Sequence, residues 1–265
     1  MSIKGLVAII TGASSGIGAG TAIFFAELDA KVVLVGRNKE NLTTVASKCY
    51  AANKDVNLLT IVADVTNDSA IKKIIDDTIN KFGQIDILVN NAGVISKGSI
   101  ENTSMEQYDY VMNTNIRSIY NLTMQAVPHL IKTKGTIVNV SSVNGMRPFC
   151  GVLAYCVSKT AVDQFTRCLA LELAPKGVRV NSVNPGVIET EIHKRGGMNE
   201  EEYQKFLKHS QTTHALGRAG TVEEIARTIH FLASSDSSYI TGANVPVDGG
   251  RHAMVSPYNG EFISF

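Results

Sequence analysis

The feature that most constrains the fold is a stretch near the N-terminus in which an uncharged apolar run leads into three glycines. Residues 7–11 read Val-Ala-Ile-Ile-Thr, and Gly12, Gly16 and Gly18 follow before a helical pattern begins near Ile23. A strand, a tight glycine turn and a helix together offer a helix N-terminus and free backbone N–H groups to a phosphate. Glycine allows the sharp turn and the close approach of a pyrophosphate. A purely structural turn remains the alternative, because the spacing is one residue longer than the common dinucleotide fingerprint.

Strand and helix patterns alternate along most of the 265 residues. Continuous apolar strands separated by amphipathic helices are typical of a parallel sheet covered on both faces, so we expect an α/β, doubly wound Rossmann fold of about seven strands. No linker and no internal repeat divides the chain, which predicts one domain over 1–250 and a tail at 251–265. The expected strands lie at about 6–11, 31–35, 58–63, 85–89, 135–140, 178–183 and 244–247. The expected helices lie at about 17–28, 39–52, 68–82, 105–132, 153–174, 200–209 and 222–233.

Capping boxes mark the start of three of these helices. In a capping box, the side chain before the helix and the side chain three residues later satisfy each other's backbone N–H groups. The pairs are Ser104 with Gln107, Asn199 with Glu202, and Thr221 with Glu224.

The composition excludes several classes of protein. The formal net charge is +1, so the sequence has no electrostatic footprint for nucleic acid or an anionic membrane surface. No run of about 18 apolar residues predicts a membrane span, and the first strand leaves no room for a secretory signal. The 4 cysteines and 6 histidines show neither disulfide nor metal-ligand spacing. We therefore expect reduced thiols, no metal site and a cytoplasmic location.

Ligands of an open parallel sheet bind beyond the carboxyl ends of the strands, so the residues after each strand are candidates for a site. The run Gly36-Arg37-Asn38 follows the second strand, where an acidic residue would accept a hydrogen bond from the ribose of NAD. Arg37 instead offers a planar fork of donors suited to a phosphate, and Ser14 can add a hydrogen bond. If the chain binds a dinucleotide, this favours NADP(H) over NAD(H). The alternative is an ordinary solvated basic loop.

Polar residues also follow the third and fourth strands. Asp64 and Val65 follow the third, where the carboxylate can accept from an adenine amino group or serve as a turn residue. The fourth ends in Asn90-Asn91-Ala92-Gly93. Buried amides are costly unless they are hydrogen-bonded, so the two asparagines either brace neighbouring strands or line the cofactor.

A further buried amide is expected in the long helix at 105–132. Asn115 falls on the inward apolar stripe of that helix, whereas Asn113 falls on the outer face with Arg117. A buried asparagine needs partners. Asn115 therefore either bridges backbone groups through a water or holds a water for proton exchange.

The fifth strand ends at Ser141-Ser142, and Tyr155 and Lys159 follow at helical spacing on one helix face. A lysine beside a tyrosine is expected to lower the pKa of the phenol by stabilising the phenolate. Such a phenol is a candidate general acid or base near neutral pH. Taken alone, the pair can also be an ordinary surface Tyr/Lys pair.

Taken together, these motifs are specific, and the chain resembles the short-chain dehydrogenase/reductase family from Lys4 to Gly250. The resemblance also rests on Asn184-Pro185-Gly186 with Thr190 and on the ending Val247-Asp248-Gly249-Gly250. The most similar subgroup includes 3-oxoacyl carrier-protein reductases, glucose 1-dehydrogenases, and steroid or other carbonyl reductases. The resemblance implies an NADP(H)-dependent oxidoreductase that moves a hydride between the nicotinamide and a carbonyl or secondary alcohol. It also implies a homotetramer or homodimer that forms through the long helices.

The resemblance implies roles for the matching positions. Tyr155 would exchange a proton with the substrate oxygen, Ser142 would hydrogen-bond that oxygen, and Lys159 would bind the nicotinamide ribose. Asn115 would anchor a water that extends the proton relay. The implied cofactor-binding residues are Gly12, Ser14, Ser15, Gly16, Ile17, Gly18, Arg37, Asn38, Asp64, Val65, Asn91, Ala92, Gly93, Tyr155, Lys159, Pro185, Gly186, Ile188 and Thr190.

Residues 187–215 join the sixth strand to the last helix and contain Gly196-Gly197. The resemblance favours a substrate lid with a glycine hinge over an ordinary long connection. Apolar residues predicted to line the lid and the facing wall favour a lipophilic ketone or alcohol (steroid-like, terpenoid or 3-oxoacyl) over a free sugar. Those residues are Ile192, Met198, Phe206 and Leu207 on the lid, with Met146, Phe149, Val152 and Leu153 opposite.

Two other function classes remain open at this point, because fold alone does not decide function. One is an epimerase, dehydratase or other lyase on the same nucleotide-binding scaffold. The other is a non-catalytic dinucleotide-binding interaction protein. The complete set of Asn115, Ser142, Tyr155 and Lys159 favours the oxidoreductase over both.

Overall fold

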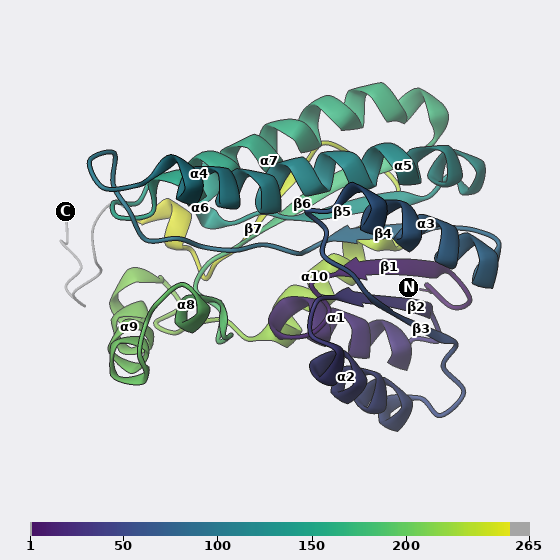
Figure 1. The fold of residues 1–265 in the computed structure, drawn as a ribbon, viewed down its shortest axis with the longest axis horizontal. Helices are drawn as coiled ribbons and strands as arrows, with labels where there is room; N and C mark the ends of the chain where they lie inside the picture. Colours follow the sequence, from purple (N-terminus) through teal and green to yellow (C-terminus); the bar gives the residue numbers. More distant parts are fainter. Residues whose placement is uncertain (1, 255–265) are drawn as a thin grey trace, which may run out of the picture.

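The computed structural model describes residues 2–254. Its core is a seven-stranded parallel sheet in the order β3-β2-β1-β4-β5-β6-β7 (Figure 1). The predicted Rossmann fold with helices on both faces is thereby confirmed. The strands are β1 (Val7–Thr11), β2 (Lys31–Gly36), β3 (Leu58–Val62), β4 (Ile87–Asn90), β5 (Thr136–Val140), β6 (Arg179–Pro185) and β7 (Asn244–Val247).

Helices connect the strands as crossovers. The helices that cover one face of the sheet are α1 (Gly16–Glu27), α2 (Lys39–Ala52) and α10 (Val222–Ala233). The main helices on the other face are α3 (Asp68–Phe82), α4 (Met105–Met112), α5 (Ser118–Thr133) and α7 (Leu153–Leu173). The remaining α-helices are α6 (Val143–Met146), α8 (Ile192–Arg195) and α9 (Glu200–Thr213).

Strand β1 illustrates how one buried strand supports both layers. Every residue of β1 is buried, as its apolar run predicts. Because successive side chains of a strand point to opposite faces, Ala8 and Ile10 join the core that contains Phe25 of α1. Val7 and Ile9 join the core on the other face.

The buried amide of Asn90 braces the sheet. Its Nδ2 donates to Asn139 Oδ1 on the neighbouring strand at 2.9 Å, and Asn139 Nδ2 donates to Thr166 Oγ1 on α7 at 2.9 Å. Of the two roles proposed for the asparagine pair, Asn90 therefore has the bracing one. Its contacts fix the register of β4, β5 and α7 next to the carboxyl ends of the strands.

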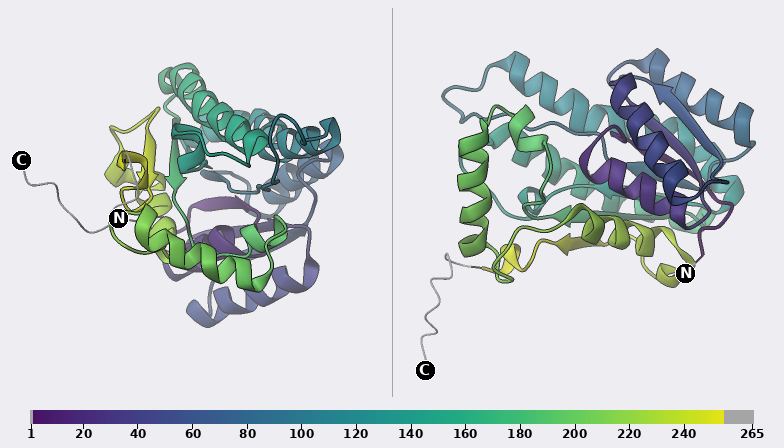
Figure 2. Two further views of the ribbon diagram at one scale, coloured as in Figure 1. Left: turned by 90° about the vertical axis from the view of Figure 1, so that its left-hand side faces the viewer. Right: turned by 90° about the horizontal axis from the view of Figure 1, so that it is seen from below.

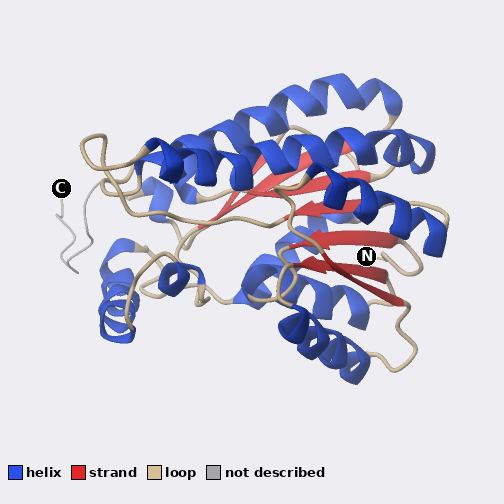
Figure 3. Ribbon diagram, viewed as in Figure 1, coloured by secondary structure: helices blue, strands red, loops and turns tan. Residues whose placement is uncertain are grey.

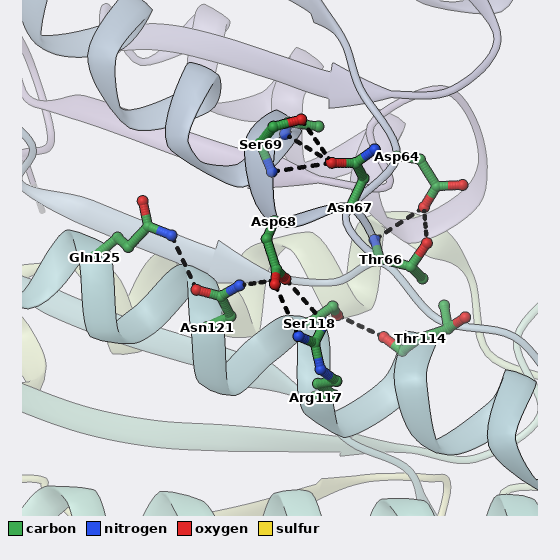
Figure 4. A network of polar contacts seen from close by, with 11 residues as sticks. Asp64, Thr66, Asn67, Asp68, Ser69, Thr114, Arg117, Ser118, Asn121 and Gln125 are labelled. Atoms are coloured by element: carbon green, nitrogen blue, oxygen red, sulfur yellow. Dashed lines mark hydrogen bonds and ion pairs between the residues drawn. The ribbon is translucent and has the colours of Figure 1, made fainter.

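The continuous helix predicted over 105–132 is wrong in one respect, because a π-helical segment at Asn113–Arg117 separates α4 from α5. The guanidinium of Arg117 donates to both carboxylate oxygens of Asp68 at 2.9 Å, and Asn121 also binds this carboxylate (Figure 4). These contacts pin the interrupted segment to α3. The prediction used a hydrophobic pattern with a period of 3.6 residues, and such a pattern does not reveal the one extra residue of a π-helical turn.

Helices α8 and α9 lie apart from the two helical layers, beyond the carboxyl ends of the strands (Figures 1 and 3). The right-hand view of Figure 2, from below, shows the same separation. The sequence predicted the start of α9 but ended it at 209 instead of 213, and it missed the single-turn helices α6 and α8. None of the helices within residues 2–254 is long and apolar enough to cross a membrane.

All three predicted capping boxes are present, and the one before α10 gives a stability test. The Thr221 hydroxyl accepts from the Glu224 N–H, and Glu224 Oε2 accepts from the Thr221 N–H. Thr221→Ala should lower the free energy of unfolding by about 1 kcal/mol, because a helix N–H loses its acceptor. Urea denaturation measures this change.

The matched control is Thr228→Ala within the same helix. The Thr228 hydroxyl only donates to the Glu224 carbonyl, which already belongs to the helix. Alanine has the higher helix propensity, so this variant should be as stable as the wild type or slightly more stable. Equal losses in the two variants would contradict the capping role.

Candidate active site

The glycine turn is packed so closely that two of its positions admit no side chain. Gly12 has φ +65°, and a Cβ there would lie 2.8 Å from Asn91 Nδ2. A Cβ on Gly18 would collide with the same amide. Asn91 Nδ2 donates to Thr11 O at 2.8 Å, and the residue also lines the groove above the turn. Asn91 therefore braces the end of β1 and also lines the groove in which the cofactor is expected.

The first turn of α1 presents backbone donors to this groove. Ser15 is the N-cap residue of α1, but its side chain accepts no hydrogen bond from the helix. Its hydroxyl accepts instead from Arg195 Nη1 of α8 at 2.8 Å. The groove has a volume of about 390 Å³. An uncapped helix N-terminus beside an arginine matches the phosphates of a dinucleotide, so the residues present fit that cofactor.

Arg37 and Asp64 lie together at the outer end of the groove, 3.8 Å apart. The side chains are 59% and 43% exposed, so the ion pair is weak and leaves the guanidinium free to turn toward a ligand. Burial raises the pKa of Asp64, but hydrogen bonds from Thr66 and the charge of Arg37 outweigh this and hold it below the usual value. The Thr66 contacts fix the Asp64 carboxylate (Figure 4).

Tyr155 and Lys159 lie one helical turn apart on α7. Both are buried, with 8% and 4% of their surfaces exposed. The Lys159 ammonium donates to Val140 O at the end of β5 at 2.8 Å, and it lies 5.6 Å from the centre of the Tyr155 ring. The lysine is thus anchored to the sheet next to the phenol.

The expectation that the pKa of Tyr155 is lowered is wrong, because its pKa is raised. Burial raises the pKa of Tyr155 to about 12, although the Ser142 hydroxyl partly offsets this. Burial also lowers the pKa of Lys159 to about 8. The reason is that both groups are buried away from water, which disfavours the phenolate of Tyr155 and the ammonium of Lys159.

Ser142 and Asn115 are held by short polar contacts. Ser142 caps α6, accepting from Asn144 N at 3.1 Å, and it lines the same cavity as Tyr155. Asn115 is fully buried in the π-helical segment. Its Oδ1 accepts from Val94 N at 2.8 Å, and its Nδ2 donates to Val94 O and Ser158 Oγ. Asn115 therefore braces the loop after β4 directly.

A second cavity, of about 400 Å³, continues from the groove and contains Ser142, Tyr155 and Lys159. Five of the eight predicted apolar wall residues line it: Phe149, Val152, Ile192, Met198 and Phe206. The other three, Met146, Leu153 and Leu207, are not among its lining residues. The walls come from the α8–α9 segment on one side and from residues before α7 on the other.

The two cavities together bring almost all of the predicted site residues into one continuous groove. Gly18 and Asn115 are the exceptions, and both lie behind the lining. Sequence reasoning missed Arg195 and His193 in the α8–α9 segment, and Arg251, which had been assigned to the tail. Residues 255–265 of that tail lie outside the described part of the chain.

Residues 2–254 contain no group of three or more His, Cys, Asp or Glu side chains that could hold a metal ion. All four cysteines are free thiols, and Cys150 lines the cavity.

Comparison with known proteins places this geometry in a family. Residues 12–252 match the family model described as enoyl-(acyl carrier protein) reductase. The chain is 39% identical to a 3-oxoacyl-[acyl-carrier-protein] reductase of Thermotoga maritima, over 94% of this chain and 99% of the relative. It is also 39% identical to a meso-2,3-butanediol dehydrogenase of Serratia marcescens, over 96% and 97%.

A solved structure agrees with these matches. A short-chain dehydrogenase/reductase from Caenorhabditis elegans, determined with its cofactor, superposes with a TM-score of 0.89. The two sequences are 37% identical, over 95% of this chain and 97% of that one. The chain is therefore a member of the short-chain dehydrogenase/reductase family, oxidoreductases that use a nicotinamide dinucleotide to interconvert carbonyl and alcohol groups.

Proposed function

We propose that this protein is an NADP(H)-dependent carbonyl reductase or alcohol dehydrogenase that acts on a lipophilic ketone or secondary alcohol. The observation that carries the proposal is the shared cavity of Ser142, Tyr155 and Lys159, which opens directly into the groove above the glycine turn. A bound nicotinamide would supply the hydride, and the protein would supply position, a proton and the electrostatic field.

Tyr155 is the proposed general acid in carbonyl reduction and the general base in the reverse reaction. Its neutral form predominates at pH 7, since burial holds its pKa near 12. Tyr155 can therefore donate its proton to a developing alkoxide. Ser142 lines the same cavity and is positioned to donate a hydrogen bond to that oxygen.

Lys159 is the proposed ligand of the nicotinamide ribose and the source of positive charge beside the phenol. Its ammonium has one hydrogen bond, to Val140 O, which leaves two of its three protons for ribose hydroxyls. Asn115 is the proposed anchor of the proton-relay water, and its bracing of Val94 keeps the loop after β4 in place.

The preference for NADP(H) rests on Arg37. It lines the groove with Ser14 and Asn38, and no carboxylate precedes it at the end of β2. A guanidinium binds a 2′-phosphate through two parallel hydrogen bonds, whereas a ribose diol calls for an acceptor. The alternative, NAD(H), would rely on Asp64 as that acceptor.

The proposal of a lipophilic substrate rests on the apolar walls contributed by Phe149, Val152, Met198 and Phe206. Steroid-like, terpenoid and 3-oxoacyl compounds are the candidate classes. We further propose that residues 187–215 form a lid, because α8 contacts the glycine turn through Arg195 and Ser15 while α9 lines the cavity through Phe206.

A homo-oligomer in the cytoplasm is part of the same proposal. Large apolar side chains are exposed on α4, α5 and α7, which suits a second copy of the chain packing there. They are Tyr110, Tyr120, Met124 and Leu171.

An epimerase or dehydratase, and a non-catalytic dinucleotide-binding protein, are the competing functions. No feature of the described residues specifically favours either. Net consumption of NADPH with a ketone supports the oxidoreductase, whereas cofactor binding without turnover of any carbonyl supports the last alternative.

Tyr155→Phe removes the proposed proton donor and little else. We expect ketone reduction to fall by a factor on the order of 10² to 10⁴, while NADPH affinity remains within about twofold of the wild type. Steady-state rates and fluorescence titration of NADPH provide the two measurements. Tyr239→Phe, at a fully exposed tyrosine, is the matched control and should leave both unchanged. Wild-type turnover in Tyr155→Phe would eliminate the proposed mechanism.

Arg37→Asp replaces a phosphate donor with a ribose acceptor. We expect the ratio of kcat/KM for NADPH to that for NADH to fall by about tenfold or more, since a charged hydrogen bond is lost and a like charge faces the phosphate. The control Lys39→Asp makes the same change of charge at the start of α2, at a residue that does not line the groove. It should shift the NADPH/NADH ratio of kcat/KM far less. Equal shifts in the two variants would show that general charge, rather than Arg37, sets the preference.

Lys159→Met tests whether a titrating ammonium is buried at the site. The folded pKa is about 8 and the ordinary value is 10.5. Between these values the unfolded chain holds a proton that the folded chain lacks, so wild-type stability rises with pH by up to about 1.4 kcal/mol per unit from this group. Below pH 8 both states carry the charge and the contribution is flat.

The free energy of unfolding, measured in urea from pH 7 to pH 10, should therefore rise more steeply in the wild type than in Lys159→Met. The difference between the two proteins isolates Lys159, because the other titrating groups are shared. Parallel curves across this range would contradict the lowered pKa of Lys159.

A further inference from the structure

The cavity beside Tyr155 has an unbalanced set of charges. Its charged lining residues are Lys97, Lys159 and Arg251, and no Asp or Glu among the described residues lines it. Lys159 donates to Val140 O, and Lys97 lies 3.8 Å from Glu202, a carboxylate outside the lining. Arg251 remains as the cation without a counterpart in the cavity.

Arg251 is partly buried, and one of its hydrogen-bond donors has no partner. Its Nε is inaccessible to solvent and has no hydrogen-bond partner. Its guanidinium carbon lies 4.7 Å from the centre of the Phe149 ring, so the group stacks on a wall of the cavity. Within residues 2–254 no carboxylate forms an ion pair with it. A guanidinium left in this state carries a desolvation cost that an anionic ligand would offset.

In the part of the chain that the structure describes, the one carboxylate whose charge reaches Arg251 is Asp248, which raises the pKa of Arg251 but forms no ion pair with it. Both oxygens of Asp248 lie within 3.1 Å of His252 Nδ1, and they also accept from the backbone N–H groups of Gly250 and His252. Arg147 donates to the carbonyl oxygens of Arg251 and Met254, which holds the segment in place. Its charge adds to that of Arg251, and burial together with this second guanidinium outweighs the charge of Asp248 and lowers the pKa of Arg251.

His193, the facing residue of the lid, is also affected by Arg251. Burial lowers its pKa to about 4, and the charge of Arg251 contributes. His193 is therefore neutral near pH 7. It lines the cavity with its ring 4.5 Å from that of Phe206, and it offers a polar edge without adding charge.

We propose that Arg251 is the anion subsite of the substrate cavity and that the substrate carries a carboxylate, which Arg251 binds while the carbonyl or alcohol lies at Tyr155. This inference deepens the proposed function and rests on it. The planar guanidinium matches a carboxylate through two parallel hydrogen bonds. The apolar walls between the two ends accommodate a short hydrocarbon body. Among the proposed lipophilic ketones and alcohols, the substrate class is thus narrowed to those that carry a carboxylate, an oxo acid or the corresponding hydroxy acid.

A binding experiment tests the subsite without relying on turnover. Hexanoate and hexanamide have nearly the same size and differ in charge, so their dissociation constants can be compared by calorimetry on the purified full chain. We expect the wild type to bind hexanoate at least tenfold more tightly than hexanamide. Arg251→Gln should remove that preference, whereas Arg251→Lys should retain part of it.

Arg227→Gln is the matched control, an arginine-to-glutamine change at an exposed residue of α10 that pairs with Glu223. It should keep the wild-type preference for hexanoate. The melting temperature and NADPH affinity of each variant show whether Arg251→Gln has kept its fold. If it has not, Arg251→Lys decides: a preference for hexanoate below that of the wild type in the folded lysine variant locates the anion at position 251, whereas an unchanged preference overturns the subsite.

Turnover then connects the subsite to the reaction. 5-Oxohexanoate and its methyl ester share the ketone and differ in the carboxylate. The wild type should prefer the acid in kcat/KM by at least tenfold, mainly through a lower KM, and Arg251→Gln should reduce the ratio toward one.

The possible outcomes separate the two proposals. Equal binding of hexanoate and hexanamide by the wild type, or a preference that survives in Arg251→Gln, would overturn the anion subsite whatever the enzyme reduces. Preferential binding of hexanoate without reduction of any ketone would uphold the subsite and contradict the proposed function instead.

Discussion

The site depends on one buried ammonium. Lys159 is 4% exposed and is held by a single carbonyl, Val140 O, at the carboxyl end of β5. A buried charge costs free energy unless it has hydrogen-bond or ionic partners. The hydrogen bond to Val140 O therefore restricts where the ammonium can lie. Lys159 lies one turn from Tyr155 in the second cavity, next to Gly93, which lines both cavities. Burying a lysine at this position costs free energy of folding. A buried charge at the carboxyl ends of the central strands therefore indicates a role in function rather than in stability.

The surrounding polar residues make this arrangement rigid. Asn184 Nδ2 donates to Ser142 O at 2.9 Å and to both oxygens of Asp163 on α7. Ser141 Oγ donates to Lys159 O at 3.1 Å. The Asn184–Asp163 and Ser141–Lys159 bonds join strand ends to α7, and the Asn184–Ser142 bond joins the ends of β6 and β5. Together they hold Ser142, Tyr155 and Lys159 at fixed separations. Preorganisation of this kind lets a proton donor act without reorganisation at the moment of reaction.

Much of this structure could be predicted from the sequence, because its signals are local. The buried run of β1 and the glycines after it specify a strand, turn and helix, and the spacing of Tyr155 and Lys159 specifies a common helix face. The predictions were wrong where a long-range environment decides. The pKa of Tyr155 is set by burial from all sides, which spacing does not reveal. Likewise, Arg251 follows the last strand motif, and only the folded chain brings it next to Phe149.

The most direct test of the account is a crystal structure of the protein with NADP⁺. We expect the pyrophosphate at the first turn of α1, the 2′-phosphate on Arg37, and the nicotinamide ring beside the Tyr155 hydroxyl with its ribose on Lys159. A cofactor bound outside this groove, or a nicotinamide turned away from Tyr155, would contradict the central claim that these residues form one catalytic site.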